Sequence, residues 1–391
     1  MSVSAAPRTP FYDLPVELVK HIVLLSTLPP HPSSGNKTSS ARTLAAIART
    51  SRALYYLYNP LLWRALDLHS QVHAQGLIRL PENEQTAALF APVRVVRANA
   101  RGGVGLYDVK GVLERLPRVQ TIRLNHLFWN VGFGLEEFAH LQELATLELS
   151  DFRLPDASRP FSLPHLTSLS LSLRTAPVAE RDIPLLLSPA TVPSLKALFL
   201  GTSPHWPFQH LPRAFVDQLD VLAFPLSQFP GFARANQLHS CETLVAAHLS
   251  LSDKNASQYL YPAGACFTSL ASTLPALHLY VTLSDDTRPG IVESNLGTLL
   301  FFIKSPFASP FFLPSHDAAQ LKLSLHLPEI LRSYPSYMFS GGVILLEKAC
   351  EETRTGVFWH NEGEEKAGAV SPAMWRFARE MKQRKEEVEE W

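Results

Sequence analysis

The side chains that could do chemistry do not gather into a known catalytic motif. The chain contains no G-x-S-x-G, no H-E-x-x-H and no phosphate-binding loop that ends in Lys-Ser/Thr. His69 and His73 have the i, i+4 spacing with which a helix can present two ligands to zinc, but no third ligand is evident. The stretch Arg101–Gly105 (RGGVG) lacks the Lys-Ser/Thr of a nucleotide site and predicts a turn. We therefore expect a non-catalytic protein without a metal ion or a cofactor.

Composition narrows the remaining classes of function. The formal net charge of the 391-residue chain is +0, so no general basic field attracts nucleic acid or anionic lipid. The apolar stretch Leu299–Ile303 is far shorter than the ~20 residues that a bilayer-spanning helix needs. Cys241, Cys266 and Cys350 are odd in number and far apart, which is typical of a reducing compartment. Because Met1–Pro10 has no apolar core like that of a signal peptide, we expect a soluble cytoplasmic or nuclear protein.

Two amphipathic segments near the N-terminus predict short helices. Leu14–Leu25 carries Pro15 at the first helical position and is apolar on two sides. Residues 26–41 are rich in Pro, Ser and Gly, which predicts a mobile loop. Helical spacing returns over Leu44–Tyr58 and stops at Asn59-Pro60. So short a segment leaves a broad apolar face, which either a partner or the chain's own C-terminal body would have to cover.

The order of these residues resembles the F-box motif of ubiquitin-ligase adaptors. Leu14-Pro15-Val16-Glu17-Leu18 opens the segment and Asn59-Pro60-Leu61-Leu62-Trp63 closes it, so that the likeness covers Phe11 to about Leu68. The segment departs from the family in its longer loop and in Thr50-Ser51-Arg52-Ala53, which stands where Cys-Arg-x-Trp is common. The resemblance implies that this module binds the linker protein Skp1 and, through it, a cullin.

The same resemblance assigns the Skp1 contact by position. Trp63 is the expected anchor, because aromatic residues are over-represented among interface hot spots. The matching positions are Leu14, Pro15, Leu18, Ile22, Leu44, Ile47, Pro60, Leu61 and Trp63.

A second pattern, L-x-x-L-x-L with any aliphatic or aromatic residue at L, recurs downstream. Successive copies start 26, 25, 22, 29, 24, 25 and 30 residues apart. The pattern is similar to leucine-rich repeats, in which each repeat supplies one strand and stacked neighbours bury a shared core. The asparagine ladder of that family is absent, so we expect an irregular solenoid of parallel strands. The copies begin at Val93, Val119, Leu144, Leu166, Leu195, Leu219, Leu244 and Leu274.

A proline precedes several copies, at Leu116-Pro117, Leu163-Pro164 and Val192-Pro193. Proline disfavours a helix in the residue before it, so we expect it to set the register of the strand that follows.

Side chains between the pattern residues would face the concave side of such a solenoid, where ligands usually bind. This row is lightly charged, with only Arg123 and Lys196 as cations, which favours an unmodified or partly apolar ligand over a phosphorylated one. The alternative is that these are ordinary solvent-facing residues. The candidate substrate contacts are Arg123, Glu148, Phe199, His248, His278 and Tyr280.

Beyond Leu283 the period fades, and residues 284–391 are expected to cap the last strand of the sheet. The final segment Pro372–Trp391 has an apolar side and a charged side, which predicts a closing helix. Its apolar side consists of Met374, Phe377, Ala378, Met381 and Val388.

These expectations describe an α/β protein with four parts: a disordered segment 1–10, an F-box-like helical module 11–68, a leucine-rich-repeat-like solenoid 69–283 and a C-terminal cap 284–391. The resemblance implies a substrate-recognition adaptor of a Skp1–cullin–F-box ubiquitin ligase, whose repeats bind a protein substrate. Two alternatives stay open: a Skp1-binding protein that acts outside a ligase, and a repeat scaffold whose first helices only cap the solenoid.

Overall fold

The computed structural model describes residues 46, 63–99, 103–125, 135–152, 161–173, 187–201, 211, 213–228, 244–256, 258–260, 276–283, 288–304, 322–333, 337–353 and 355–360. The chain divides into two compact units, one formed by Met1–Leu66 with Pro81–Arg94 and the other by Asp67–Leu80 with Val95–Trp391. All the expected Skp1 contacts except Trp63 lie outside the described residues, as do the expected loop 26–41 and the expected closing helix.

The first unit contains a short helix among its described residues, α5 (Glu84–Phe90). Asn83 caps this helix, because its side-chain oxygen accepts a hydrogen bond from the Thr86 N–H at 2.9 Å. Glu84 in the first turn faces the positive end of the helix dipole. After α5, the Arg94 N–H donates to the carbonyl of Arg64 at 2.9 Å, which holds the returning chain beside the residue that follows Trp63.

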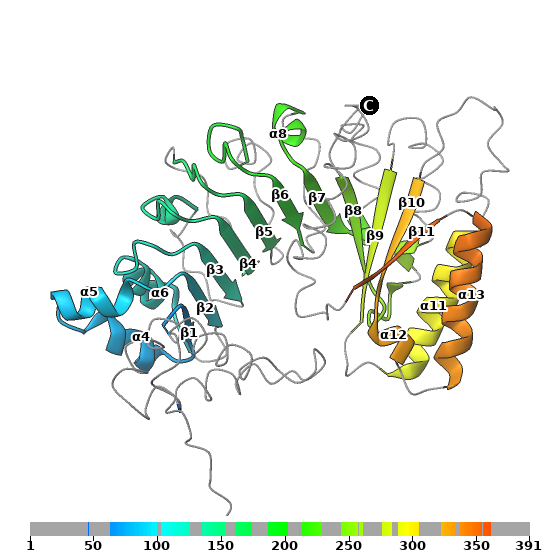
Figure 1. Ribbon diagram of the computed structural model, residues 1–391, viewed down its shortest axis with the longest axis horizontal. Helices are drawn as coiled ribbons and strands as arrows, with labels where there is room; N and C mark the ends of the chain where they lie inside the picture. The colour runs from blue at the N-terminus through cyan, green and yellow to red at the C-terminus, as the bar shows by residue number, and fades with distance from the viewer. Residues whose placement is uncertain are drawn as a thin grey trace, which may run out of the picture. The chain divides into compact units, whose positions relative to one another are not determined.

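A parallel sheet is the main element of the structure. Within the described residues eleven strands form this sheet, and their order in space follows their order in the chain (Figure 1). Every neighbouring pair from β2 to β11 is parallel. The strands are β1 (Ala65–Leu68), β2 (Val95–Asn99), β3 (Thr121–Asn125), β4 (Thr146–Phe152), β5 (Ser168–Leu173), β6 (Ala197–Leu200), β7 (Val221–Pro225), β8 (Leu244–Ser250), β9 (Ala276–Thr282), β10 (Lys322–Pro328) and β11 (Gly356–His360).

Each of the eight predicted pattern copies leads into one of these strands, from β2 to β9. In β3, Ile122 and Leu124 are fully buried, and Leu147 and Leu149 repeat the arrangement in β4. Side chains along a strand alternate between its two faces, so the pattern leucines of every repeat point to the same side and form a continuous core. The prediction of an α/β fold with parallel strands is confirmed.

A tight turn precedes these strands and explains the prolines. The backbone N–H of the last turn residue donates to the carbonyl three residues earlier, with both end residues buried. Pro117, Pro164 and Pro193 occupy the second position of three such turns, where the fixed φ of proline suits a type I turn. The turns are Leu116–Val119, Leu141–Leu144, Leu163–Leu166, Val192–Leu195 and Val216–Leu219.

The sheet continues past the point where the sequence period fades. β10 pairs with β9 and β11 pairs with β10, both within the segment that we expected to serve as a cap. The chain between the starts of these strands is lengthened by inserted helices, so the step from Ala276 to Lys322 exceeds the spacing of the earlier repeats. The sequence pattern therefore did not predict β10 and β11, because the spacing between strands changes here although the sheet continues.

Helices and short helical turns connect the strands of the second unit. Figure 1 shows α11 and α13 side by side, and each has a buried apolar stripe. On α11, Asn295 is buried and its side-chain amide donates to the carbonyls of Leu251 and Asp253 at 2.8 and 2.9 Å, which ties the helix to the turn after β8. The connecting elements are α4 (Gln71–Ile78), α6 (Leu106–Leu113), η3 (Leu135–Phe138), α8 (Arg213–Asp217), η6 (Leu226–Gln228), α11 (Pro289–Lys304), α12 (Ile330–Ser333) and α13 (Tyr337–Thr353).

Two local motifs of the sequence take a definite form in the structure. Ser70 is the N-cap of α4, so His69 lies before the helix and does not share a helical face with His73. Within the glycine-rich stretch, the described Gly103 lies in a turn with φ 73°, a conformation that favours glycine. Gly105 then begins α6, with its N–H donating to Asp108 Oδ2 at 3.1 Å.

The buried leucine and isoleucine side chains should determine stability. Ile122→Ala removes a side chain that is 0% exposed, so we expect the free energy of unfolding to fall by about 2–5 kcal/mol, because a cavity remains. Ile344→Ala is the matched control: its side chain is 63% exposed, and its loss should change stability by less than about 0.5 kcal/mol. Urea denaturation followed by circular dichroism measures both. Equal losses for the two variants would contradict the assignment of the core.

Candidate functional site

The sheet face opposite the pattern leucines is the candidate binding surface, and we call it the polar face. The strand register aligns its side chains in two rows. The first row contains Arg97, Arg123, Glu148, Ser170, Phe199, Ala223 and His278. The second row contains Pro225, His248, Tyr280, His326 and Phe358.

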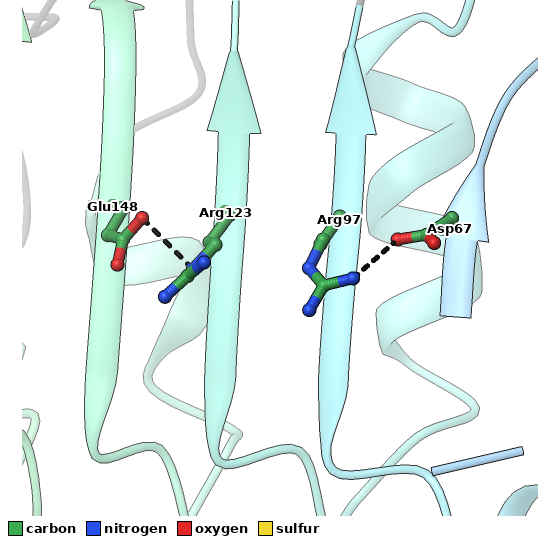
Figure 2. Close-up of polar contacts among 4 residues, drawn as sticks. All are labelled: Asp67, Arg97, Arg123 and Glu148. Atoms are coloured by element: carbon green, nitrogen blue, oxygen red, sulfur yellow. Dashed lines mark hydrogen bonds and ion pairs between the residues drawn. The ribbon is translucent and has the colours of Figure 1, made fainter. Parts of the chain in front are cut away.

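Four charged side chains lie next to one another at the β1 end of the polar face (Figure 2). Arg97 Nη1 donates to Asp67 Oδ1 at 3.3 Å, and Arg123 Nε lies 3.0 Å from Glu148 Oε2. Each arginine therefore has its carboxylate on the side away from the other arginine, as Figure 2 shows. Across the strands the charges run negative, positive, positive, negative, so the two like charges are neighbours.

The four charged side chains are partly buried. Burial raises the pKa of the Glu148 carboxyl, and the positive charges of Arg123 and Arg97 oppose this shift. The Arg123 Nε is buried against Glu148 Oε2, so the two groups form a charge-assisted ion pair that is largely shielded from water. The Arg123 side chain as a whole stays 35% exposed, and its two Nη atoms carry four further N–H donors.

Histidine side chains occupy the other end of the polar face, one on each strand from β8 to β11. His278 Nδ1 lies 3.1 Å from His326 Nε2, so one ring nitrogen donates its proton to the other. His360 Nε2 donates to the carbonyl of Val281 at 2.9 Å, and His248 Nε2 lies 2.9 Å from the Thr282 hydroxyl. These contacts link strands that are far apart in the sequence.

Aromatic stacking joins the same histidines to their neighbours. Tyr280 stacks on His360 with ring centroids 4.3 Å apart, and His326 stacks on Phe358 at 5.0 Å. Nearer the middle of the sheet, Phe199 meets His248 edge to face at 6.3 Å. The histidines are therefore packed as rings within a layer of aromatic side chains.

This packing keeps His248, His278 and His326 neutral at physiological pH. Burial lowers the pKa of His248 and of His278 to about 4, and that of His326 to about 3. Neighbouring histidines add a smaller downward shift for His248 and His326, because a second positive ring nearby would repel the first. Each ring can thus serve as a neutral donor and acceptor inside the layer.

The structure separates the expected substrate contacts into two kinds. Phe199, His278 and Tyr280 are buried, with 2%, 5% and 3% exposure, so they pack within the sheet layer instead of facing solvent. The expectation that these three side chains face the concave side as accessible contacts is therefore wrong. Arg123 and Glu148 retain side-chain exposures of 35% and 19%, and His248 is half-buried. The accessible part of the expected row therefore lies at its charged end.

Three residues of the polar face were missing from the sequence-based set. Arg97 lies between Val96 and Ala98, as Arg123 lies between two pattern residues, so the weak first copy already contained the signal. His326 belongs to a strand with alternating buried leucines, which the change of period concealed. His360 lies on a strand that carries no L-x-x-L-x-L copy.

Trp63 is the one expected Skp1 contact within the described residues. It is half-buried and lies in a turn, and β1 begins at Ala65. The other eight contacts remain predictions, because they lie outside the part of the chain that the structure describes.

No family model matches the chain, and no curated protein matches it. Among the described residues no group of three or more His, Cys, Asp or Glu side chains could hold a metal ion. Within the same residues, no helix has the length and apolar character needed to cross a bilayer.

The neutral histidines predict a stability that depends on pH. Above about pH 6.5, the ordinary pKa of histidine in an unfolded chain, these histidines are neutral in both states and do not lower the free energy of unfolding. Below about pH 6.5 they bind protons in the unfolded chain but stay neutral in the folded chain. The free energy of unfolding therefore falls as pH decreases from about 6.5 toward 4. At pH 5, His278 and His326 should each lower the free energy of unfolding by about 2 kcal/mol relative to pH 7.5. Urea denaturation at the two pH values measures this difference.

A non-titrating variant isolates the contribution of the buried rings. His326→Gln should show a smaller loss of stability between pH 7.5 and pH 5 than the wild type, whereas the same change at the exposed His73 should leave the pH dependence unaltered. Identical pH dependence in all three proteins would show that His326 is not the source.

Proposed function

We propose that this chain is a non-catalytic adaptor of the F-box type. Its N-terminal segment would bind a Skp1-like linker protein and, through it, a cullin, while the polar face of the sheet binds a protein substrate. The adaptor would act by bringing the substrate close to the enzyme that the cullin carries, since proximity alone can supply a large part of a rate enhancement.

The observation that carries this proposal is the difference between the two faces of the sheet, one of which forms the core while the other varies in chemistry. One face carries a row of aliphatic side chains, of which Ile122, Leu147 and Leu169 are 0% exposed. The other face changes from strand to strand, from charged residues to histidines and aromatic rings. A constant core with a variable surface is what a leucine-rich repeat solenoid needs for protein binding.

The N-terminal sequence supports the recruiting half of the proposal. The F-box-like order closes with Asn59-Pro60-Leu61-Leu62-Trp63, and the first strand of the sheet follows from Ala65. The chain thus passes from the expected recruiting module into the expected substrate-binding body without an intervening domain.

Binding of Skp1 by the full-length chain tests the proposal. We expect the two proteins to co-purify after co-expression, and we expect Leu18→Asp or Trp63→Ala to weaken the complex by about 30-fold or more, as loss of an interface hot spot does. Val72→Asp is the matched control, because Val72 is 82% exposed on α4 and lies outside the expected contact. Affinity is measured by biolayer interferometry with purified Skp1. Failure of the wild-type chain to bind Skp1 would overturn the recruiting role.

A cullin distinguishes the remaining alternatives. An adaptor should form a ternary complex with Skp1 and the cullin on size-exclusion chromatography. A complex that excludes the cullin would assign the chain to Skp1-binding proteins that act outside a ligase, and absence of both partners would leave a repeat scaffold.

A further inference from the structure

The two neighbouring arginines at the β1 end of the polar face form an incomplete charge pattern. Arg97 and Arg123 are register partners on β2 and β3, and paired strands lie about 4.8 Å apart. Like charges placed directly opposite each other on a sheet are destabilising. Asp67 and Glu148 offset this repulsion from the outer sides only. A further negative group would therefore be most stabilised if it lay between the two arginines.

We propose that Arg97 and Arg123 bind a carboxylate side chain of the protein ligand that the polar face holds. This inference rests on the proposed function for the existence of a protein ligand, and it adds the chemistry by which that ligand is recognised. An Asp or Glu of the ligand would lie between the two guanidinium groups and restore the alternation of charge from β1 to β4.

The donors needed for this contact are present. A guanidinium group has five N–H donors, and Arg97 uses one of them on Asp67 while Arg123 contacts Glu148 through Nε. Within the described residues neither arginine has another hydrogen-bonding partner. Side-chain exposures of 46% for Arg97 and 35% for Arg123 allow an approaching ligand to reach them.

The balance of charge favours a carboxylate over a phosphate group. The four side chains of this group carry a formal net charge of zero, since two arginines face two carboxylates. A carboxylate would leave the group with one negative charge, whereas a phosphate would leave nearly two beside Glu148, whose own charge is already disfavoured by burial. Charge-assisted hydrogen bonds from arginine to a carboxylate are also short and geometrically specific.

Selection from a random-peptide phage library tests the proposal with the full-length chain immobilised and no Skp1 present. We expect peptides that share an Asp or Glu at one position, and we expect that preference to disappear on the double variant Arg97→Gln/Arg123→Gln. Peptides without a shared acidic position, or an acidic preference that the double variant keeps, would overturn the proposal.

Affinities of a selected peptide then assign the contact to these residues. In fluorescence anisotropy, Arg97→Gln and Arg123→Gln should each weaken binding by about 10-fold or more, as loss of a hydrogen bond between charged groups does. Arg118→Gln is the matched control, because Arg118 is exposed outside the polar face, and it should bind like the wild type. Glu148→Gln should bind more tightly than the wild type, because it removes a competing carboxylate. A loss of affinity in Glu148→Gln, or an equal loss in Arg118→Gln, would contradict the site.

Variants of the same peptide identify the chemical group. Replacing the acidic residue of the peptide by glutamine should weaken binding by the same factor as the arginine substitutions do. Tighter binding of a peptide with phosphoserine at this position would overturn the assignment to a carboxylate. Since Skp1 takes no part in these measurements, failure here leaves the recruiting role standing, and failure of Skp1 binding leaves the peptide site standing.

Discussion

A single repeat of this chain cannot bury its own leucines, because one strand and one turn offer them no second layer. Only the stacking of neighbouring repeats removes side chains such as Ile122, Leu147 and Leu169 from water, and the register of the sheet places these three residues in line. The rest of the structure depends on this shared burial. The turns that precede the strands serve it by starting each strand at the point where its leucines meet those of the previous repeat.

The same constraint leaves the opposite face of the sheet free to vary. Side chains alternate along a strand, so each leucine that is fixed in the core is followed by a position that the core does not specify. The chain fills these positions with charged residues from β1 to β4 and with histidines from β8 to β11. One backbone geometry thus carries an accessible charged end and a largely buried histidine end on the same face, separated by strands in which Ser170 and Ala223 are small and buried.

Local spacing made much of the fold predictable, because the signal for each strand lies within a few residues. The positions of β2 to β9 follow from the recurring pattern, and Arg97 could have been included by the rule that selected Arg123. β10 was not predicted, although Leu323, Leu325 and Leu327 alternate with other residues along it, because α11 interrupts the repeat period. The contact between His278 and His326 joins residues 48 positions apart and depends on the register of two strands, which no local pattern contains. The burial of Phe199 and Tyr280 likewise depends on the layer as a whole.

The placement of the histidines on consecutive strands makes the effect of acid directional. In a sheet built from repeats, each strand is held mainly by its immediate neighbours, so a local loss of cohesion spreads along the array from the point where it begins. Among the described strands β11 stands last in the order and pairs with β10 alone. Acidification acts on His248, His278 and His326 of β8 to β10 and should therefore destabilise this side of the array first, while the arginine-bearing strands stay assembled. The two halves of one continuous sheet would then differ in the conditions under which they hold their shape.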